Sequence, residues 1–126
     1  IEARTLGNLA INHIIPAATS YQSQLLKNVA LMKSLFPHEW ESLSAYEINL
    51  IKKIAGYNAE IKAKVDTMVE KRRIANRIPD LYEKAIAYHE ISERLMDIRK
   101  PIDMLEEIVD DNVWPMPKYR ELLWIR

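Results

Sequence analysis

The chain has 126 residues, of which 48% are hydrophobic and 29% charged, with two glycines and no cysteine. Eighteen basic and eighteen acidic side chains balance, so no long-range field draws the protein to nucleic acid or to an anionic membrane. The lack of cysteine excludes disulfides and thiolate metal sites and fits a reducing compartment. No apolar run approaches the roughly 18 residues of a membrane span. We therefore expect one soluble, cytoplasmic domain, and scarce glycine with helical apolar spacing favours an all-α fold.

The first predicted helix covers residues 2–36. Its apolar side chains recur at spacings of three and four and define one broad face directed at a core: Ile11, Ile14, Ala18, Tyr21, Leu25, Met32 and Leu35, with Ile15, Val29 and Phe36 beside them. Pro16 should remove one backbone hydrogen bond and bend the axis. Pro37 ends the helix, because the residue before a proline is disfavoured in α geometry. Since the sequence opens on Ile1 without a capping residue, we expect this helix to continue from an upstream part of a longer chain.

The second predicted helix covers residues 43–76. Ser44 and Glu47 have the spacing of a capping box, in which the serine hydroxyl accepts a backbone N–H bond at the helix start. Pro79 stops the helix, and Asp80 is placed to cap the next one. The face directed at the core consists of Leu43, Leu50, Ile54, Tyr57, Ile61, Val65 and Met68.

The third predicted helix covers residues 80–111, with a kink or a fresh start at Pro101. Its apolar face consists of Leu81, Ala85, Tyr88, Leu95, Ile102, Leu105 and Val109, widened by Ile91 and Ile98. Each of the three helices is about 45 Å long at 1.5 Å per residue. Short connections make neighbouring helices antiparallel. The sequence therefore predicts one domain, residues 1–126, built as an elongated antiparallel three-helix bundle of long kinked helices with the tail, 112–126, docked back on it.

This C-terminal tail differs in composition from the helices before it. Residues 110–126 hold two of the three tryptophans and two of the six prolines. Left free, the tail would expose an apolar patch, and such patches mark an interface or an internal dock. Both interpretations stay open. The candidate docking residues are Trp114, Pro115, Pro117, Tyr119, Arg120, Leu123 and Trp124.

Chemistry-bearing residues do not assemble into a motif. The histidines, His13, His38 and His89, lack the spacing of a di-metal bundle, and we expect partly buried histidine packing beside Tyr88. Arg72, Arg73 and Arg77 could bind a dicarboxylate, but Glu60 with Lys64 and Glu90 with Arg94 have the spacing of salt bridges on a solvated face. Residues 101–113 carry five acids and no base and could face a basic surface. We predict no catalytic, cofactor-binding or metal-binding residue in this chain.

Two stretches carry a family resemblance. "EARTLGNLAINHIIPAATSYQ" at 2–22 and "LEEIVDDNVWPMPKYRELLWIR" at 105–126 resemble the C-terminal region of type III glutamine synthetases, the large bacterial form. The resemblance implies a parent enzyme that makes glutamine from glutamate, ammonia and ATP with a divalent metal such as magnesium, in a homo-oligomeric ring. It also implies an upstream catalytic domain that holds the ATP and metal sites. This chain would then be a non-catalytic structural or assembly extension whose tail anchors the chain end.

Two other classes of function are compatible with the residues. One is a free-standing helical interaction module that binds a partner through the tail or through residues 101–113. The other is a small all-α enzyme of the chorismate mutase type that uses Arg72, Arg73 or Arg77. Outward-facing arginines paired with acids would argue against the enzyme, and a tail buried within one chain would argue against the partner-binding module.

Overall fold

The computed structural model describes residues 2–114, and every regular element in that range is helical. The elements are α1 (Glu2–Leu9), the π-helix η1 (Ala10–Ile14), α2 (Ile15–Leu35), α3 (Trp40–Leu43), α4 (Ala45–Asn76), α5 (Leu81–Glu93) and α6 (Leu95–Ile108). The predicted all-α class is therefore confirmed. Within the described range, none of the helices combines the length and the apolar character that crossing a membrane would need.

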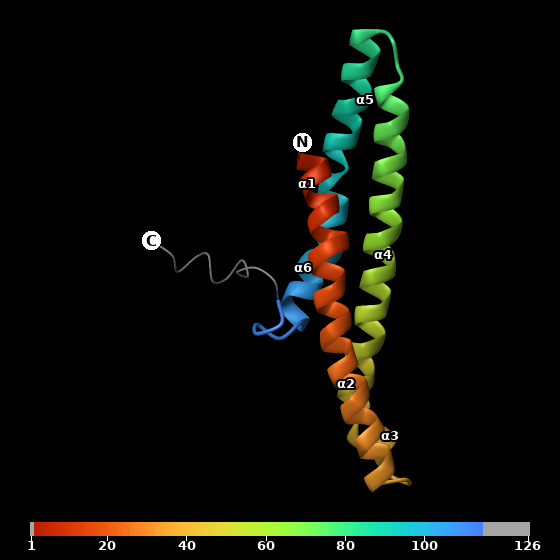
Figure 1. Cartoon of the computed structure of the whole chain (residues 1–126). Coiled ribbons are helices and arrows are strands. Elements are labelled where there is room, and N and C mark those ends of the chain that lie inside the picture. Colours follow the sequence, from red (N-terminus) through yellow and green to blue (C-terminus); the bar gives the residue numbers. More distant parts are fainter. Residues whose placement is uncertain (1, 115–126) are drawn as a thin grey trace.

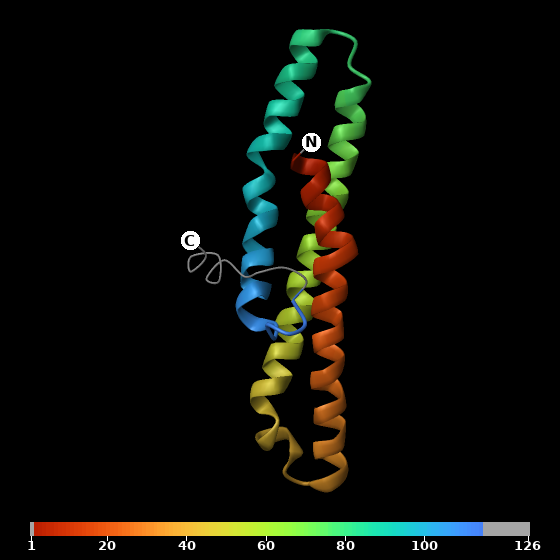
Figure 2. The same cartoon turned by 60° about the vertical axis from the view of Figure 1, so that its left-hand side comes forward.

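The helices form an elongated, staggered assembly around α4. Helices α1, η1 and α2 make one continuous rod, and α5 with α6 makes another, while α4 runs the length of the molecule between its two ends (Figures 1 and 2). Helix α4 packs against α2, α5 and α6. Near the α2–α3 turn only α2 and α4 lie side by side, and near the α4–α5 turn only α4 and α5 do (Figure 2). The side-by-side arrangement of three rods expected of a three-helix bundle therefore occurs only near the middle.

One apolar cluster fills this middle part. It includes Ile14, Ile54, Ile61 and Leu105, each 0% exposed. Several residues predicted to face the core are instead exposed, because they lie at ends where only two rods meet. These are Leu35, Phe36, Leu43, Leu81, Ala85 and Tyr88. The periodicity identifies the inward face of each helix but not the length over which a neighbour covers that face.

Pro16 is accommodated by the π-helix before it. A proline in a helix lacks an N–H donor, and its ring clashes with the carbonyl four residues earlier. Here the turn over Ala10–Ile14 widens, and the Ile15 N–H bonds to the carbonyl oxygen of Ala10, five residues back. The extra residue relieves the crowding. The rod consequently continues through Pro16 without a sharp break (Figure 1).

The interruption expected at Pro101 occurs earlier, at Arg94. Helix α5 ends at Glu93, α6 begins at Leu95, and Pro101 is buried inside α6. Pro101 cannot donate to the carbonyl oxygen of Asp97, four residues before it. The Lys64 Nζ on α4 donates to that oxygen instead, at 2.9 Å. A side chain from another helix thus satisfies the carbonyl that the proline frees, and the helix persists.

The start of α4 does not use the predicted capping box. Ser44 occupies the N-cap position, but its side chain makes no capping hydrogen bond. A short helix, α3, precedes it, and the Ser44 N–H already bonds to the Trp40 carbonyl oxygen at 2.9 Å. Ser44 is 0% exposed, and its hydroxyl has no partner among the described residues. By contrast, Asp80 caps α5 as predicted, with its carboxylate accepting from the Glu83 N–H at 3.1 Å.

Candidate functional site

The segment that follows α6 turns the chain back toward the core. Val109 adopts an extended conformation and ends α6. The Asp110 Oδ1 then accepts a hydrogen bond from the Asn112 N–H at 3.0 Å. The Asp110 carbonyl oxygen accepts from the N–H groups of Val113 and Trp114, at 2.9 and 3.1 Å. Aspartate and asparagine favour such turns because their short side chains bond to nearby backbone. The turn at 110–114 therefore sets the direction in which Trp114 leaves the helix.

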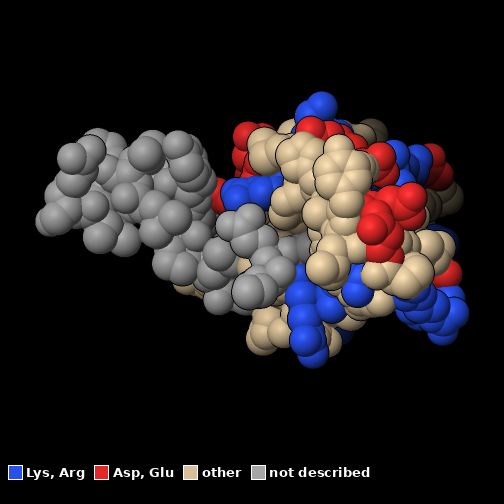
Figure 3. Space-filling view, turned by 90° about the horizontal axis from the view of Figure 1, so that it is seen from above, with Lys and Arg blue, Asp and Glu red and all other residues tan. Residues whose placement is uncertain are grey.

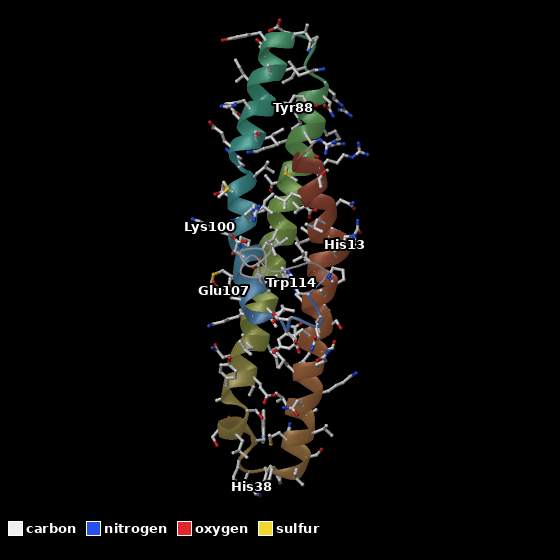
Figure 4. The ribbon with its side chains drawn as sticks, turned by 90° about the vertical axis from the view of Figure 1, so that its left-hand side faces the viewer. His13, His38, Tyr88, Lys100, Glu107 and Trp114 are labelled. Carbon is white, nitrogen blue, oxygen red and sulfur yellow. The ribbon has the colours of Figure 1, made fainter. Side chains whose placement is uncertain are left out.

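Trp114 is the last residue of this turn, and its side chain lies in the core. Its side chain is 7% exposed and belongs to the same cluster as Ala18, Leu105 and Val109. Figure 4 shows it near the middle of the molecule, between α6 and the N-terminal rod. Its indole N–H has no hydrogen-bond partner within residues 2–114. The ring contributes apolar burial, while the N–H reduces the net gain, because a buried unpaired donor is costly.

Tyr21 on α2 is close enough to this turn for the charge of Asp110 to act on its hydroxyl. Burial raises the pKa of the Tyr21 hydroxyl, and the negative charge of Asp110 raises it further. Both effects disfavour the phenolate, since one removes hydration and the other adds a like charge. Tyr21 also packs against the core cluster. The folded chain therefore favours the neutral phenol of Tyr21.

Of the seven predicted docking residues, the structure describes only Trp114. Pro115, Pro117, Tyr119, Arg120, Leu123 and Trp124 lie outside the described residues. The burial of Trp114 within its own chain argues against its use as a free contact for another protein. The turn residue Asp110 was not identified from the sequence as part of this site, although its place in "VDDNVW" is typical of a turn.

The histidines do not come together. His13 lies near the middle of the molecule and His38 at its lower end (Figure 4), and both are exposed. His89 is also exposed, and its Nε2 lies 3.0 Å from the Glu93 Oε1. The expected partly buried histidine beside Tyr88 is therefore wrong: Tyr88 lies toward the α4–α5 end (Figure 4), and both residues are exposed. Among residues 2–114, no three His, Cys, Asp or Glu side chains are grouped in a way that could hold a metal ion.

The arginines on α4 do not converge on a ligand. Arg73 contacts both carboxylate oxygens of Glu70 at 2.7 Å on the exposed surface. Arg72 is half-buried and Arg77 exposed beyond the helix end. Seen from the α4–α5 end, basic, acidic and uncharged side chains are interspersed (Figure 3). This arrangement argues against the chorismate mutase interpretation.

The ion pairs predicted from helical spacing form in part. Lys64 and Glu60 pair at 2.8 Å, as predicted. Glu90 and Arg94 form no ion pair in the described part of the chain, and Arg94 is the residue that follows the end of α5. In the acidic segment, Asp103 lies 3.9 Å from Arg99, and Asp110 holds the turn. Glu107 points outward from α6 (Figure 4). Some of these acids therefore have structural roles, which weakens the prediction of a basic partner.

The fold and the C-terminal turn define a rod-shaped helical domain without an assembled reaction centre among its described residues. The sequence family described as "Glutamine synthetase C-terminal domain" matches residues 1–33. A glutamine synthetase of Bacteroides fragilis is 48% identical over 128 aligned positions, which cover 100% of this chain. A type-3 glutamine synthetase of Dictyostelium discoideum is 27% identical and also covers 100% of the chain. These matches confirm the resemblance to the C-terminal region of glutamine synthetases.

The relatives are much longer than this chain. It spans 18% of the Bacteroides protein and 17% of the Dictyostelium protein. The comparisons therefore relate these residues to one part of a larger protein of that family.

Proposed function

We propose that these residues form a non-catalytic C-terminal domain with a structural or assembly role in a type III glutamine synthetase. The parent would be a cytoplasmic, homo-oligomeric enzyme that joins ammonia to glutamate with ATP. The observation that carries this proposal is the 48% identity along the whole chain to a glutamine synthetase of which the chain spans only 18%. ATP and magnesium would bind in the upstream catalytic domain. No group of side chains in the described residues fits a metal.

The exposed ends of the rod support an assembly role. Leu31 and Leu35 on α2 are 69% and 71% exposed, and Leu81 and Tyr82 on α5 are 80% and 76% exposed. Large apolar side chains gathered at a surface are typical of protein interfaces. The upstream domain of the same chain, or a neighbouring subunit, would cover these ends. Trp114 lies near the middle of the molecule, away from both of these ends (Figure 4).

Truncation of the parent tests this proposal. Full-length parent and a version that ends before Glu2 are compared for phosphate release that depends on ATP, glutamate and ammonia. Light scattering records the size of each. We expect the truncated protein to lose the native assembly. A truncated protein of unchanged size and turnover would contradict an assembly role, and a parent without this activity would contradict the enzyme assignment.

Two point variants test the assembly role without removing the whole domain. Leu35→Asp and Leu81→Asp each place a charge on one apolar end, where the side chain of the isolated domain is already solvated. Folding should therefore be unaffected, while a contact across that end would be lost. Lys62→Asp is the control for a new surface carboxylate, because Lys62 is exposed on α4 and pairs with Asp66, four residues along the same helix, at 2.7 Å. An assembly that all three variants preserve would exclude both ends as contacts.

A further inference from the structure

A cavity of about 260 Å³ lies between α4 and the junction of α5 with α6. Its floor is apolar and consists of Met68, Ile91 and Ile98, which are 6%, 4% and 2% exposed. The cavity is at the level of Arg94, where the rod of α5 and α6 is interrupted. It is smaller than the roughly 300–1,000 Å³ of a drug-sized pocket, so a ligand would have to be small.

Lys64 lines one side of the cavity, and two of its three N–H donors are already used within the fold. Its Nζ bonds to the Glu60 Oε2 at 2.8 Å and to the Asp97 carbonyl oxygen at 2.9 Å. The carboxylate of Glu60 balances its charge. Because Glu60 already pairs with Lys64, the unpaired charges beside the cavity come from other side chains.

Three other charged side chains line the cavity, and none forms an ion pair within residues 2–114. They are Lys71, which is half-buried, and the exposed Arg94 and Asp97. Glu90 adds a second carboxylate beside Lys71, because both line an adjoining hollow of about 170 Å³. The available positive and negative charges thus balance. A simple anion or cation would meet repulsion as well as attraction, whereas a molecule with both charges would meet a partner for each.

We propose that this cavity binds a free α-amino acid with an aliphatic or aromatic side chain. Lys71 and Arg94 receive the carboxylate, and Arg94 has the planar donor geometry that suits it. Asp97 accepts from the ammonium group, and the side chain packs on Met68, Ile91 and Ile98. Because Arg94 and Asp97 are exposed to solvent, we expect a dissociation constant on the order of 1 mM. Such a site is separate from the assembly role.

Nuclear magnetic resonance of the 126-residue chain labelled at methionine and isoleucine methyl groups tests the site. L-leucine is the probe. L-leucinamide, which lacks the carboxylate, and N-acetyl-L-leucine, which lacks the ammonium group, are its matched analogues. We expect L-leucine to shift the methyl signals of Met68, Ile91 and Ile98, and each analogue to bind at least about fivefold more weakly. Unshifted floor signals at saturating L-leucine, or equal binding of the analogues, would overturn the site.

Variants of the charged residues supply the second readout. Arg94→Gln and Asp97→Asn should each weaken L-leucine binding at least about fivefold, because each removes one charged partner. Arg99→Gln is the control, since Arg99 is comparably exposed on α6 and lies near Asp103 outside the cavity. Thermal melts establish that each variant folds. Equal weakening of L-leucine binding by Arg99→Gln would refute the amino-acid site. Failure of the amino-acid site would not affect the assembly proposal, because assembly is tested separately by the size and turnover of the parent.

Discussion

Replacement of Trp114 by alanine should destabilise the domain by about 3 kcal/mol. Truncation of a buried tryptophan to alanine costs about 3–5 kcal/mol, counting lost apolar burial and the cavity left behind. Trp114 is 7% exposed, so nearly the whole ring contributes. The unpaired indole N–H costs on the order of 1 kcal/mol in the folded state, and its removal places the loss at the lower end of that range. Thermal unfolding followed by circular dichroism should show a midpoint about 10 °C lower for a domain of this size.

Two companion variants separate the ring from its N–H and from the turn. Trp114→Phe keeps an aromatic ring and removes the unpaired donor, so its free energy of unfolding should stay within about 1.5 kcal/mol of the parent chain. Asp110→Ala removes the acceptor for the Asn112 N–H and should cost about 1 kcal/mol. If Trp114→Ala melted within about 2 °C of the unmodified chain, the ring would contribute little to the core, and the anchoring role would be refuted.

Three further changes test other parts of the fold. Gly56→Ala should stabilise the chain by about 0.5–1 kcal/mol in urea unfolding, because Gly56 is exposed inside α4 and an added Cβ meets nothing within 4 Å. A decrease would mean that α4 is distorted there. Ser44→Ala should raise the free energy of unfolding by about 1 kcal/mol by removing a buried hydroxyl without a partner, whereas a loss of similar size would indicate a functioning cap. Tyr21 has a raised pKa, so the folded state holds its proton more tightly than the unfolded state. Stability present below about pH 10 should therefore be lost as the pH rises from that value through the higher pKa of the folded state, and less so in Tyr21→Phe. Equal pH dependence of the two proteins in urea unfolding between about pH 9 and 11.5 would contradict the raised pKa.

Local signals in the sequence predict much of the fold correctly. Helix α2 ends before Pro37, α4 ends before Pro79, and Asp80 caps α5, because each depends on the chemistry of a few adjacent residues. The inward face of α4 was likewise identified, and Ile54, Ile61 and Val65 are buried. Interactions within one helical turn are visible in a single sequence.

The features that were mispredicted depend on contacts between distant residues. Helix α6 continues through Pro101 because Lys64, 33 positions from Asp97, satisfies the freed carbonyl oxygen. The stagger of the rods leaves Leu81 exposed although its spacing is that of a core residue. The cavity also could not be predicted, because its lining residues come from α4 and from the distant junction of α5 with α6. Periodicity gives the direction of a side chain, but it cannot give the residue that lies opposite.

Because the rods are staggered, the residues that stabilise the fold and the large apolar residues that are exposed lie in different parts of the molecule. The side chains that hold the domain together lie near the middle, where all three rods meet, and Trp114 belongs to the same cluster. The two-rod ends bury less apolar surface, and they carry Leu35 and Leu81 in solvent. A domain whose core lies at its centre keeps its fold while its ends gain or lose neighbours, because contacts at the ends involve no core residue. If the domain organises a larger enzyme, the ends are therefore where substitutions should alter assembly at unchanged stability, and the Trp114 turn is where they should alter stability first.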